Sequence, residues 1–414
     1  MLEPGTADST AINAGTLLVG TGEVRTDVTV GVADGMIREV THEAPDGNYD
    51  RTIDARDQVV MPGLIDAHVH LVYTGDADDM DISRYSDEYL SLRGAELACD
   101  ALHAGITTLG DAASKNNSIL ALRNAIDDGV TMGPRIKACG SMIAITGGRA
   151  TGGEPGGNIV EIDGTDEMRE ATRRLLMYHG VDFIKLAATG AISSPHTGAR
   201  DPQLTTAEMQ AAVEEAHNCG RPVHAHCYGE AGITNALEAG VDVIVHGQEL
   251  TDDHLDTMES QGTMLMPTLS TYRKKMALDD QDPYTDEDVT RDRPDSTAGL
   301  IAASKPTYQR ALEHGIPMAM GTDTGMPPVF QGDNADDLVY MVDWGMDPAD
   351  AIVAGTHNAA KSLAIEDELG SIAEGKHADL LILDRNPIDD ITVLTDDTMI
   401  DQIILGGTVI HTGS

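Results

Sequence analysis

Two histidines separated by one residue are the first candidates for metal ligands in this chain. His68 and His70 follow the apolar run Met61–Ile65, which has the composition of a buried strand. Side chains two residues apart on a strand point to the same side and lie about 6.6 Å apart along it. Two imidazoles at that separation can bind one metal ion, although an isolated pair of this kind also occurs on half-exposed strands without a metal.

Further residues of metal-ligating type end other apolar runs. His224 and His226 close one run, His246 closes the next, and Asp323 closes a later one. Lys185 ends an apolar segment in a chain that has only eight lysines. Because a buried ammonium group is costly without a partner, this lysine needs either a carboxylate beside it or a chemical role.

Strand-like apolar runs alternate with helix-like stretches, such as 207–219 and 232–239, through the middle of the chain. This alternation predicts an α/β fold, a (β/α)8 TIM barrel, whose active site would lie at the carboxyl ends of the strands. The glycine-rich segment 143–165 and the polar segment 270–300 are expected to be long loops. The predicted strands begin near Leu64, Thr107, Ile136, Phe183, Val223, Val243, Met264 and Met318.

Both ends of the chain have a different pattern, of short strands and tight turns. Asp34–Gly35 lies between two strand-like runs near the N-terminus, and Gly406–Gly407 lies between two such runs near the C-terminus. We therefore expect a small β-sandwich domain built from both termini, residues 1–60 plus 370–414. The barrel would then comprise residues 61–369.

The chain is strongly acidic. Its 414 residues include 69 Asp and Glu but only 27 Lys and Arg, a formal net charge of −42, while 41% hydrophobic residues suffice for a large core. A field of this sign repels nucleic acids and anionic membranes, so neither is an expected partner. An evenly acidic, lysine-poor surface is typical of a high-salt cytoplasm, and the first residues lack a signal-peptide pattern. We expect a cytoplasmic protein from a halophilic host.

Several longer segments, taken together, resemble the amidohydrolase superfamily, and most closely its prolidase-like and imidazolonepropionase-like branch of metallo-dipeptidases. The resemblance covers nearly the whole chain, including both ends. The segments are VVMPGLIDAHVHL (59–71), DFIKLAATGAISSP (182–195), RPVHAHCYGEAGITNALEAGVDVIVHG (221–247), MPTLSTY (266–272), MAMGTDTG (318–325) and GSIAEGKHADLLILDRNP (370–387).

The resemblance implies a centre of two divalent metal ions. His68, His70 and Asp323 would bind the first ion, and His226 and His246 would bind the second. Imidazole and carboxylate ligands favour zinc, with manganese, cobalt or iron as alternatives.

Lys185 would react with carbon dioxide and bridge both ions as a carbamate. This role also answers the problem of its burial, because a carbamylated lysine is an anionic oxygen ligand and not a buried cation. His224 shares a strand face with His226 and stays open as an alternative ligand.

The implied reaction is hydrolysis of an amide or peptide bond in a dipeptide or an N-acyl amino acid. A hydroxide bridging the two metal ions would attack the carbonyl, and Asp323 would take its proton and pass it to the leaving amine. Tyr228 is a candidate to hydrogen-bond the carbonyl oxygen or a substrate carboxylate. Arg149 and His196 are further candidates for contacts with the substrate.

Two other classes of function stay open. A mononuclear deaminase or cyclic-amide (imidazolone-type) hydrolase on the same barrel would place a glutamate soon after the fifth-strand histidine, and Glu230 follows His226 by four residues. Lys185 argues against that enzyme type. A non-enzymatic scaffold tends to lose its ligands, whereas all six candidates are present here. We expect a small-molecule substrate and, as is common in this superfamily, a homo-oligomer.

Overall fold

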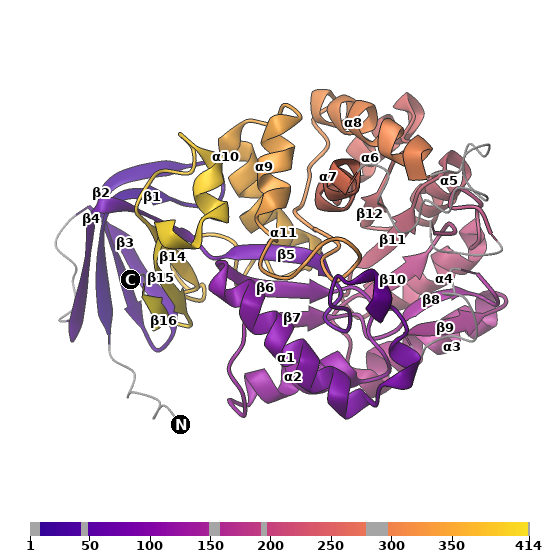
Figure 1. The fold of residues 1–414 in the computed structure, drawn as a ribbon, viewed down its shortest axis with the longest axis horizontal. Helices are drawn as coiled ribbons and strands as arrows, with labels where there is room; N and C mark the ends of the chain where they lie inside the picture. The colour runs from indigo at the N-terminus through magenta and orange to yellow at the C-terminus, as the bar shows by residue number, and fades with distance from the viewer. Residues whose placement is uncertain (1–8, 43–48, 149–157, 192–196, 279–296, 413–414) are drawn as a thin grey trace.

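The architecture follows from three hydrogen-bonded sheets in the part of the chain that the structure describes. This computed structural model describes residues 9–42, 49–148, 158–191, 197–278 and 297–412. Figure 1 shows a β-rich part at one end of the molecule and a larger part in which strands and helices alternate.

The two ends of the chain share one mixed sheet of seven strands. Strand β4 pairs in parallel with β1 and antiparallel with β14, so the N-terminal and C-terminal segments meet at β4. The predicted union of both termini is therefore present as one sheet, while the sandwich packing and the domain boundaries stay predictions. In sheet order the strands are β16 (Thr408–Thr412), β15 (Ile400–Leu405), β14 (Leu380–Leu383), β4 (Arg51–Pro62), β1 (Thr10–Leu18), β2 (Val24–Ala33) and β3 (Met36–Thr41).

The middle of the chain forms two parallel sheets. One has the order β5-β6-β7 and the other the order β13-β12-β11-β10-β8-β9. All of these strands except β8 and β9 begin within one residue of a predicted start. The strands are β5 (Leu64–Val69), β6 (Ile106–Asp111), β7 (Arg135–Ala138), β8 (Met142–Ile145), β9 (Ile159–Ile162), β10 (Ile184–Ala187), β11 (Val223–Cys227), β12 (Val243–His246) and β13 (Met264–Met266).

Residues 318–324, the eighth predicted strand, run between the outer strands of these two sheets. Isolated parallel bridges join this segment to β13 on one side and to β5 on the other. At a second place, just before β10, the backbone amide of Asp182 donates a 2.9 Å hydrogen bond to the carbonyl of Ala138 at the end of β7. The chain is thus an α/β protein in which backbone contacts connect the two parallel sheets at two places.

Helices connect most of the successive parallel strands, though none is described between β7, β8 and β9, and their buried small and aliphatic residues pack on the sheets. Helix α4, for example, begins with a capping box in which Thr205 and Glu208 satisfy each other's backbone amides, and α5 ends at Gly240 in the left-handed conformation. The helices are α1 (Asp87–His103), α2 (Ser118–Asp127), α3 (Thr165–Arg174), α4 (Thr206–His217), α5 (Glu230–Ala239), α6 (Asp252–Gln261), α7 (Leu269–Leu278), α8 (Thr297–Glu313), α9 (Asp336–Asp343), α10 (Pro348–Val353) and α11 (Ala359–Ser362).

The two segments expected to be long loops contain regular structure. Segment 143–165 includes most of β8 and all of β9, and segment 270–300 includes most of α7 and the start of α8. The prediction was wrong there because four-residue strands carry too little periodicity, and α7 has a mixed polar sequence.

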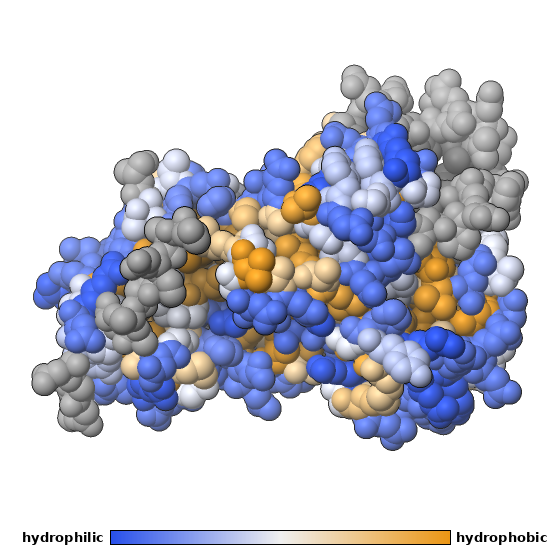
Figure 2. Space-filling model, turned by 90° about the horizontal axis from the view of Figure 1, so that it is seen from below, coloured by the Kyte–Doolittle hydropathy of each residue, from blue (hydrophilic) through white to orange (hydrophobic). Residues whose placement is uncertain are grey.

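Hydrophilic side chains cover most of the face seen in Figure 2, with apolar side chains in smaller patches between them. This agrees with the acidic composition. Among the described residues, no helix combines the length and the apolar character needed to cross a membrane.

A buried ion pair joins the seven-stranded sheet to the parallel strands. Arg135 at the start of β7 donates to both carboxylate oxygens of Asp379, at 2.6 and 3.2 Å. The Asp379 side chain is 2% exposed and also accepts a hydrogen bond from the amide of Gly406. The carboxylate therefore holds groups from β7 and from the β15–β16 turn beside β14.

We expect Asp379→Ala to lower the free energy of unfolding by about 3 kcal/mol, because it leaves a partly buried guanidinium and a backbone amide without their acceptor. Chemical denaturation followed by circular dichroism measures this. Asp54→Ala removes the exposed partner of Arg56 and should change the midpoint little. Equal effects of the two substitutions would contradict a special role for Asp379.

A second buried carboxylate fixes the start of α7. Asp337 on α9 accepts hydrogen bonds from the amide (2.7 Å) and hydroxyl (2.9 Å) of Ser270 through Oδ1, while its Oδ2 has no hydrogen-bond partner among the described residues. Burial raises the pKa of Asp337 to about 7, against the opposing effect of these two hydrogen bonds. The folded chain therefore binds this proton more tightly than the unfolded chain, and its stability falls as pH rises from about 4 to about 7.

Asp337→Asn keeps the acceptor oxygen and removes the titration. The variant should gain stability relative to the parent as pH rises from about 4 to about 7, by on the order of a few kcal/mol, and the difference should be constant above that range. Urea midpoints at several pH values measure the difference, with Asp57→Asn as an exposed control. A difference that does not depend on pH would show that Asp337 is ionised throughout.

Candidate metal centre

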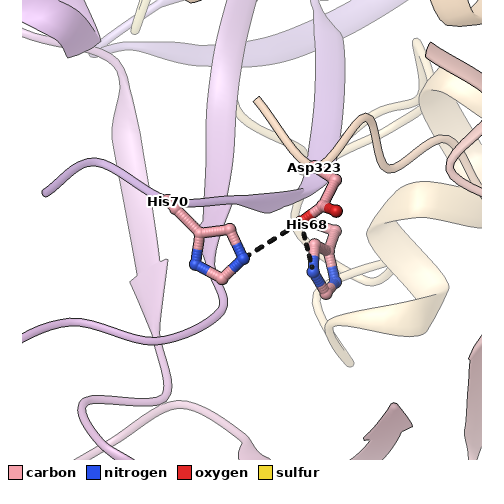
Figure 3. Close-up of side chains that lie close together, drawn as sticks. All are labelled: His68, His70 and Asp323. Atoms are coloured by element: carbon pink, nitrogen blue, oxygen red, sulfur yellow. Dashed lines mark ion pairs between the residues drawn. The ribbon is translucent and has the colours of Figure 1, made fainter. Parts of the chain in front are cut away.

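Three buried side chains from two distant parts of the chain converge at the carboxyl end of β5 (Figure 3). His68 and His70 lie at the end of that strand, and Asp323 lies in segment 318–324 beside it. One ligand atom from each residue lies within 4.8 Å of the others. The Oδ1 atom of Asp323 is 3.4 Å from Nε2 of His68 and 3.1 Å from Nε2 of His70. None of the three residues is more than 5% exposed.

The backbone around Asp323 is shaped for this approach. Asp323 has φ 65°, a left-handed conformation that is unusual for a residue with a side chain. A Cβ atom at Gly321 would lie 2.4 Å from Sδ of Met266 and 2.8 Å from Cβ of His68. Only glycine therefore lets this segment lie so close to both β5 and β13.

The electrostatics of this group favour an anionic Asp323 carboxylate and a neutral His68 imidazole, which are the forms that bind cations. Burial alone raises the pKa of Asp323, but its contacts with His68 and His70 outweigh this and hold the pKa well below its usual range. Burial and the nearby charge of Lys185 lower the pKa of His68 well below its ordinary value, although Asp323 opposes them. The carboxylate is therefore anionic and the His68 imidazole neutral.

The donor set fits a divalent metal ion. Both ring nitrogens of His70 and the Oδ1 atom of Asp323 are buried and have no hydrogen-bond partner among the described residues. Buried polar atoms are normally satisfied, so atoms left in this state at one point need a ligand. Imidazole nitrogen and carboxylate oxygen are ordinary zinc ligands.

A second pair of imidazoles lies at the ends of the neighbouring strands β11 and β12. Nδ1 of His226 is 2.9 Å from Nε2 of His246. The other nitrogen of His226 lies 2.9 Å from the carbonyl oxygen of Gly190, which can only accept, so Nε2 carries the hydrogen and Nδ1 presents a lone pair. Nδ1 of His246 lies 2.8 Å from the hydroxyl of Thr268. A shared proton or a cation can satisfy the two facing nitrogens.

Lys185 lies against the first of these two groups. It lies on β10, is 1% exposed, and its Nζ atom is 3.4 Å from Nδ1 of His68. The rings of His68 and His246 are 6.0 Å apart between centroids. The contact between His68 and His246 therefore joins the second pair to the first group and Lys185 in one buried cluster.

His224, the alternative ligand, makes a different set of contacts. Its Nε2 atom is 2.7 Å from the carbonyl oxygen of Ser362, and its ring packs on Phe183 at 4.7 Å. Burial lowers the pKa of His224 to about 3, so the ring is neutral. The Nε2 atom of His224 is thus directed at the last residue of α11 and not at His226 or His246.

Aromatic side chains cover the second pair of histidines. The ring of Tyr228 stacks on His246 at 4.7 Å and meets His226 edge-on at 4.6 Å. Tyr272 on α7 is fully buried, with its hydroxyl 3.2 Å from Nδ1 of His246. Tyr272 was not singled out from the sequence, although it follows a strand end, as the predicted ligands do.

Three candidate site residues from the sequence are not part of the buried cluster among the described residues. Arg149 and His196 lie outside the residues that the structure describes, so their predicted contacts with the substrate stay predictions. Glu230, the glutamate that a mononuclear enzyme would use, is exposed in the first turn of α5.

Comparisons with known proteins agree with this chemistry. A model of the amidohydrolase family matches residues 59–410. Ochratoxinase from Aspergillus niger is 30% identical over 436 residues, which cover 97% of this chain and 86% of that protein. A crystal structure of a Xaa-Pro dipeptidase with methionine in its active site is 33% identical, with a TM-score of 0.86, and covers 98% of this chain and 100% of that one. Imidazolonepropionase from Haloarcula marismortui is 25% identical over 411 residues, covering 94% of this chain and 91% of that protein.

The family match covers most of the chain, and the fold, the buried donor cluster and the relatives agree. The resemblance identified from the sequence is thereby confirmed: the chain belongs to the amidohydrolase family and is a hydrolase of carbon–nitrogen bonds.

Proposed function

We propose that this protein is a binuclear metal-dependent amidohydrolase that cleaves the amide or peptide bond of a dipeptide or an N-acyl amino acid. The observation that carries the proposal is the pair of buried donor groups, His68–His70–Asp323 and His226–His246, together with the buried Lys185, which lies 3.4 Å from His68. The likeness to a Xaa-Pro dipeptidase supports the substrate class.

We also propose that the two parallel sheets close into a (β/α)8 barrel of residues 61–369, beside the β-domain of residues 1–60 and 370–414. The bridges of segment 318–324 to β13 and β5, and the hydrogen bond from Asp182 to Ala138, support this closure. The donor groups then lie at the carboxyl ends of barrel strands, the face on which such barrels carry their active sites.

In this proposal, His68, His70 and Asp323 would hold one divalent ion and His226 and His246 the other, with zinc as the expected metal. The two ions would activate water as a nucleophile near neutral pH and polarise the scissile carbonyl. The remaining chemistry belongs to side chains of the protein.

As an ammonium group, Lys185 is positively charged, which is unfavourable beside a site that is to bind cations. In that form it lowers the pKa of His68 and of His224 by repulsion, and it would repel a bound cation in the same way. Its neutral amine can add to carbon dioxide with release of a proton. The resulting carbamate is an anion with two oxygen donors, which suits a bridging position between two cations.

Asp323 and Tyr228 would handle the proton and the substrate. The Asp323 carboxylate is ionised, so it can accept the proton of the attacking water and then deliver it to the leaving amine. The Tyr228 hydroxyl would donate a hydrogen bond to the carbonyl oxygen, where negative charge develops. Both residues are at most 5% exposed, so bulk water screens these interactions little.

A mononuclear deaminase or imidazolone-type hydrolase is the second candidate, because of the likeness to an imidazolonepropionase. The exposure of Glu230 speaks against it, since that reading needs the glutamate beside His226. The number of metal ions per chain separates the two candidates.

We expect Lys185→Ala to reduce the metal content from about two ions per chain to fewer, and to abolish the effect of added bicarbonate on metal loading. Elemental mass spectrometry on protein purified in molar salt measures this. Lys361→Ala, an exposed lysine on α11, is the matched control. About one ion that the substitution does not affect would favour the mononuclear candidate, and no bound metal would favour a scaffold.

We expect Asp323→Asn to keep the fold and much of the metal but to lower kcat by about 100-fold or more, because an amide cannot accept the proton. Steady-state kinetics on a panel of dipeptides and N-acyl amino acids measures the loss. Near-normal turnover by the variant would remove Asp323 from the proton-transfer role.

A further inference from the structure

Asp66, two residues before His68, has a fully buried carboxylate, and each of its two oxygens accepts two hydrogen bonds. Its Oδ1 atom accepts hydrogen bonds from the amides of His68 and Thr322, both at 3.1 Å. Its Oδ2 atom accepts from the hydroxyl of Thr322 at 2.6 Å and from the side-chain amide of Asn334 at 2.7 Å. Asp66, Thr322 and Asn334 are each 0% exposed.

These contacts hold both neighbours of Asp323. The Thr322 hydroxyl, which donates to Asp66, also accepts from the amide of Thr324 at 3.0 Å. The Asn334 side-chain amide lies 3.3 Å from the Thr324 hydroxyl. The residues before and after Asp323 are therefore tied to one another, to β5 and to the loop that precedes α9.

Asp323 itself is in the conformation that needs such support. A left-handed φ on a residue with a side chain costs on the order of 1 kcal/mol, and it persists where the surroundings fix it. The conformation directs the carboxylate toward His68 and His70. Because Asp66 shares β5 with His68, and His70 directly follows this strand, the Asp66 carboxylate fixes Asp323 relative to both histidines.

We infer that Asp66, Thr322 and Asn334 form a positioning network that holds the Asp323 carboxylate in register with His68 and His70. The inference rests on the proposed role of Asp323, and it adds three residues that touch neither the substrate nor the metal. The Thr322 hydroxyl is the link whose loss frees the Asp323 backbone most directly, since it joins the Asp66 carboxylate to the backbone amide of Thr324. A displacement of about 1 Å at the reacting group costs about 100-fold in rate.

The decisive comparison is between Thr322→Val and Thr322→Ser. Valine removes the hydroxyl at nearly constant shape, while serine keeps it. We expect Thr322→Val to lower kcat by about 10- to 100-fold with KM within about twofold, and to weaken Zn²⁺ binding in a chelator competition. Thr322→Ser should stay within a few-fold of the parent in both measurements.

Thr172→Val is the matched control, because Thr172 on α3 is equally buried and its hydroxyl has no hydrogen-bond partner among the described residues. It should behave as the parent does. Asn334→Ala, which removes a different donor to the same Asp66 oxygen, should repeat the loss and replaces Thr322→Val if that variant does not fold.

Two outcomes would overturn the inference. Parent-like kcat and Zn²⁺ affinity in folded Thr322→Val would show that the network does not position Asp323. An equal loss in Thr322→Ser would show that the methyl group and not the hydroxyl matters. If the parent hydrolyses none of the panel, the proposed function fails, and the Zn²⁺ affinities of the variants still decide whether the network positions the site.

Discussion

The candidate site depends on one constraint: the Asp323 carboxylate must stay ionised although it is buried away from water. Removing an anion from water costs several kcal/mol unless opposite charge or hydrogen-bond donors replace the solvent. At Asp323 the contacts with His68 and His70 hold the pKa well below the usual range in spite of burial, although they leave Oδ1 without a hydrogen-bond partner among the described residues. The imidazoles are themselves buried, and His68 is neutral, so the cluster as a whole has an excess of electron pairs. A cation at this point removes the excess, which is why the donor set indicates a metal more strongly than the residue types alone.

The rest of the fold supports this arrangement in two ways. Parallel strands bring their carboxyl ends to the same side, so residues that are far apart in the sequence meet without long loops. The chain then departs from regular strand geometry where a side chain must turn inward: Asp323, His246 and Thr268 all have a positive φ. Strain of this kind is common at functional sites, where hydrogen bonds from the surroundings compensate for it. At Asp323 these hydrogen bonds come from Thr322 and Thr324, and at His246 they come from Thr268.

The sequence was sufficient for the strands that carry the donors, but not for the groups that support them. Apolar runs that end in His, Lys or Asp predicted the strand starts, because burial and polarity change sharply at a strand end, while the donor set came from the family resemblance. Strand β4 was missed because only Ile53 and Ala55 are apolar within Arg51–Gln58, too few for a clear alternation, although the strand lies at the centre of its sheet. The partners of Asp66 could not be predicted, since Thr322 and Asn334 are 256 and 268 positions away and polar residues in loops have no periodic signal. Only the folded chain brings them together.

The large negative charge of the surface has little influence on events at this centre. Salt screens exposed charges over about 8 Å at 0.15 M and about 3 Å at 1 M, distances shorter than the depth of a domain of this size. Acidic residues far from the cluster therefore neither attract its cations strongly nor exclude an anionic substrate. Groups within the buried cluster are screened much less, so the sign of Lys185 matters more than the sum of 69 acidic residues. In the proposed centre, Lys185 would oppose cation binding as an ammonium group and promote it as a carbamate, so one covalent change at one side chain would decide whether the site can hold metal.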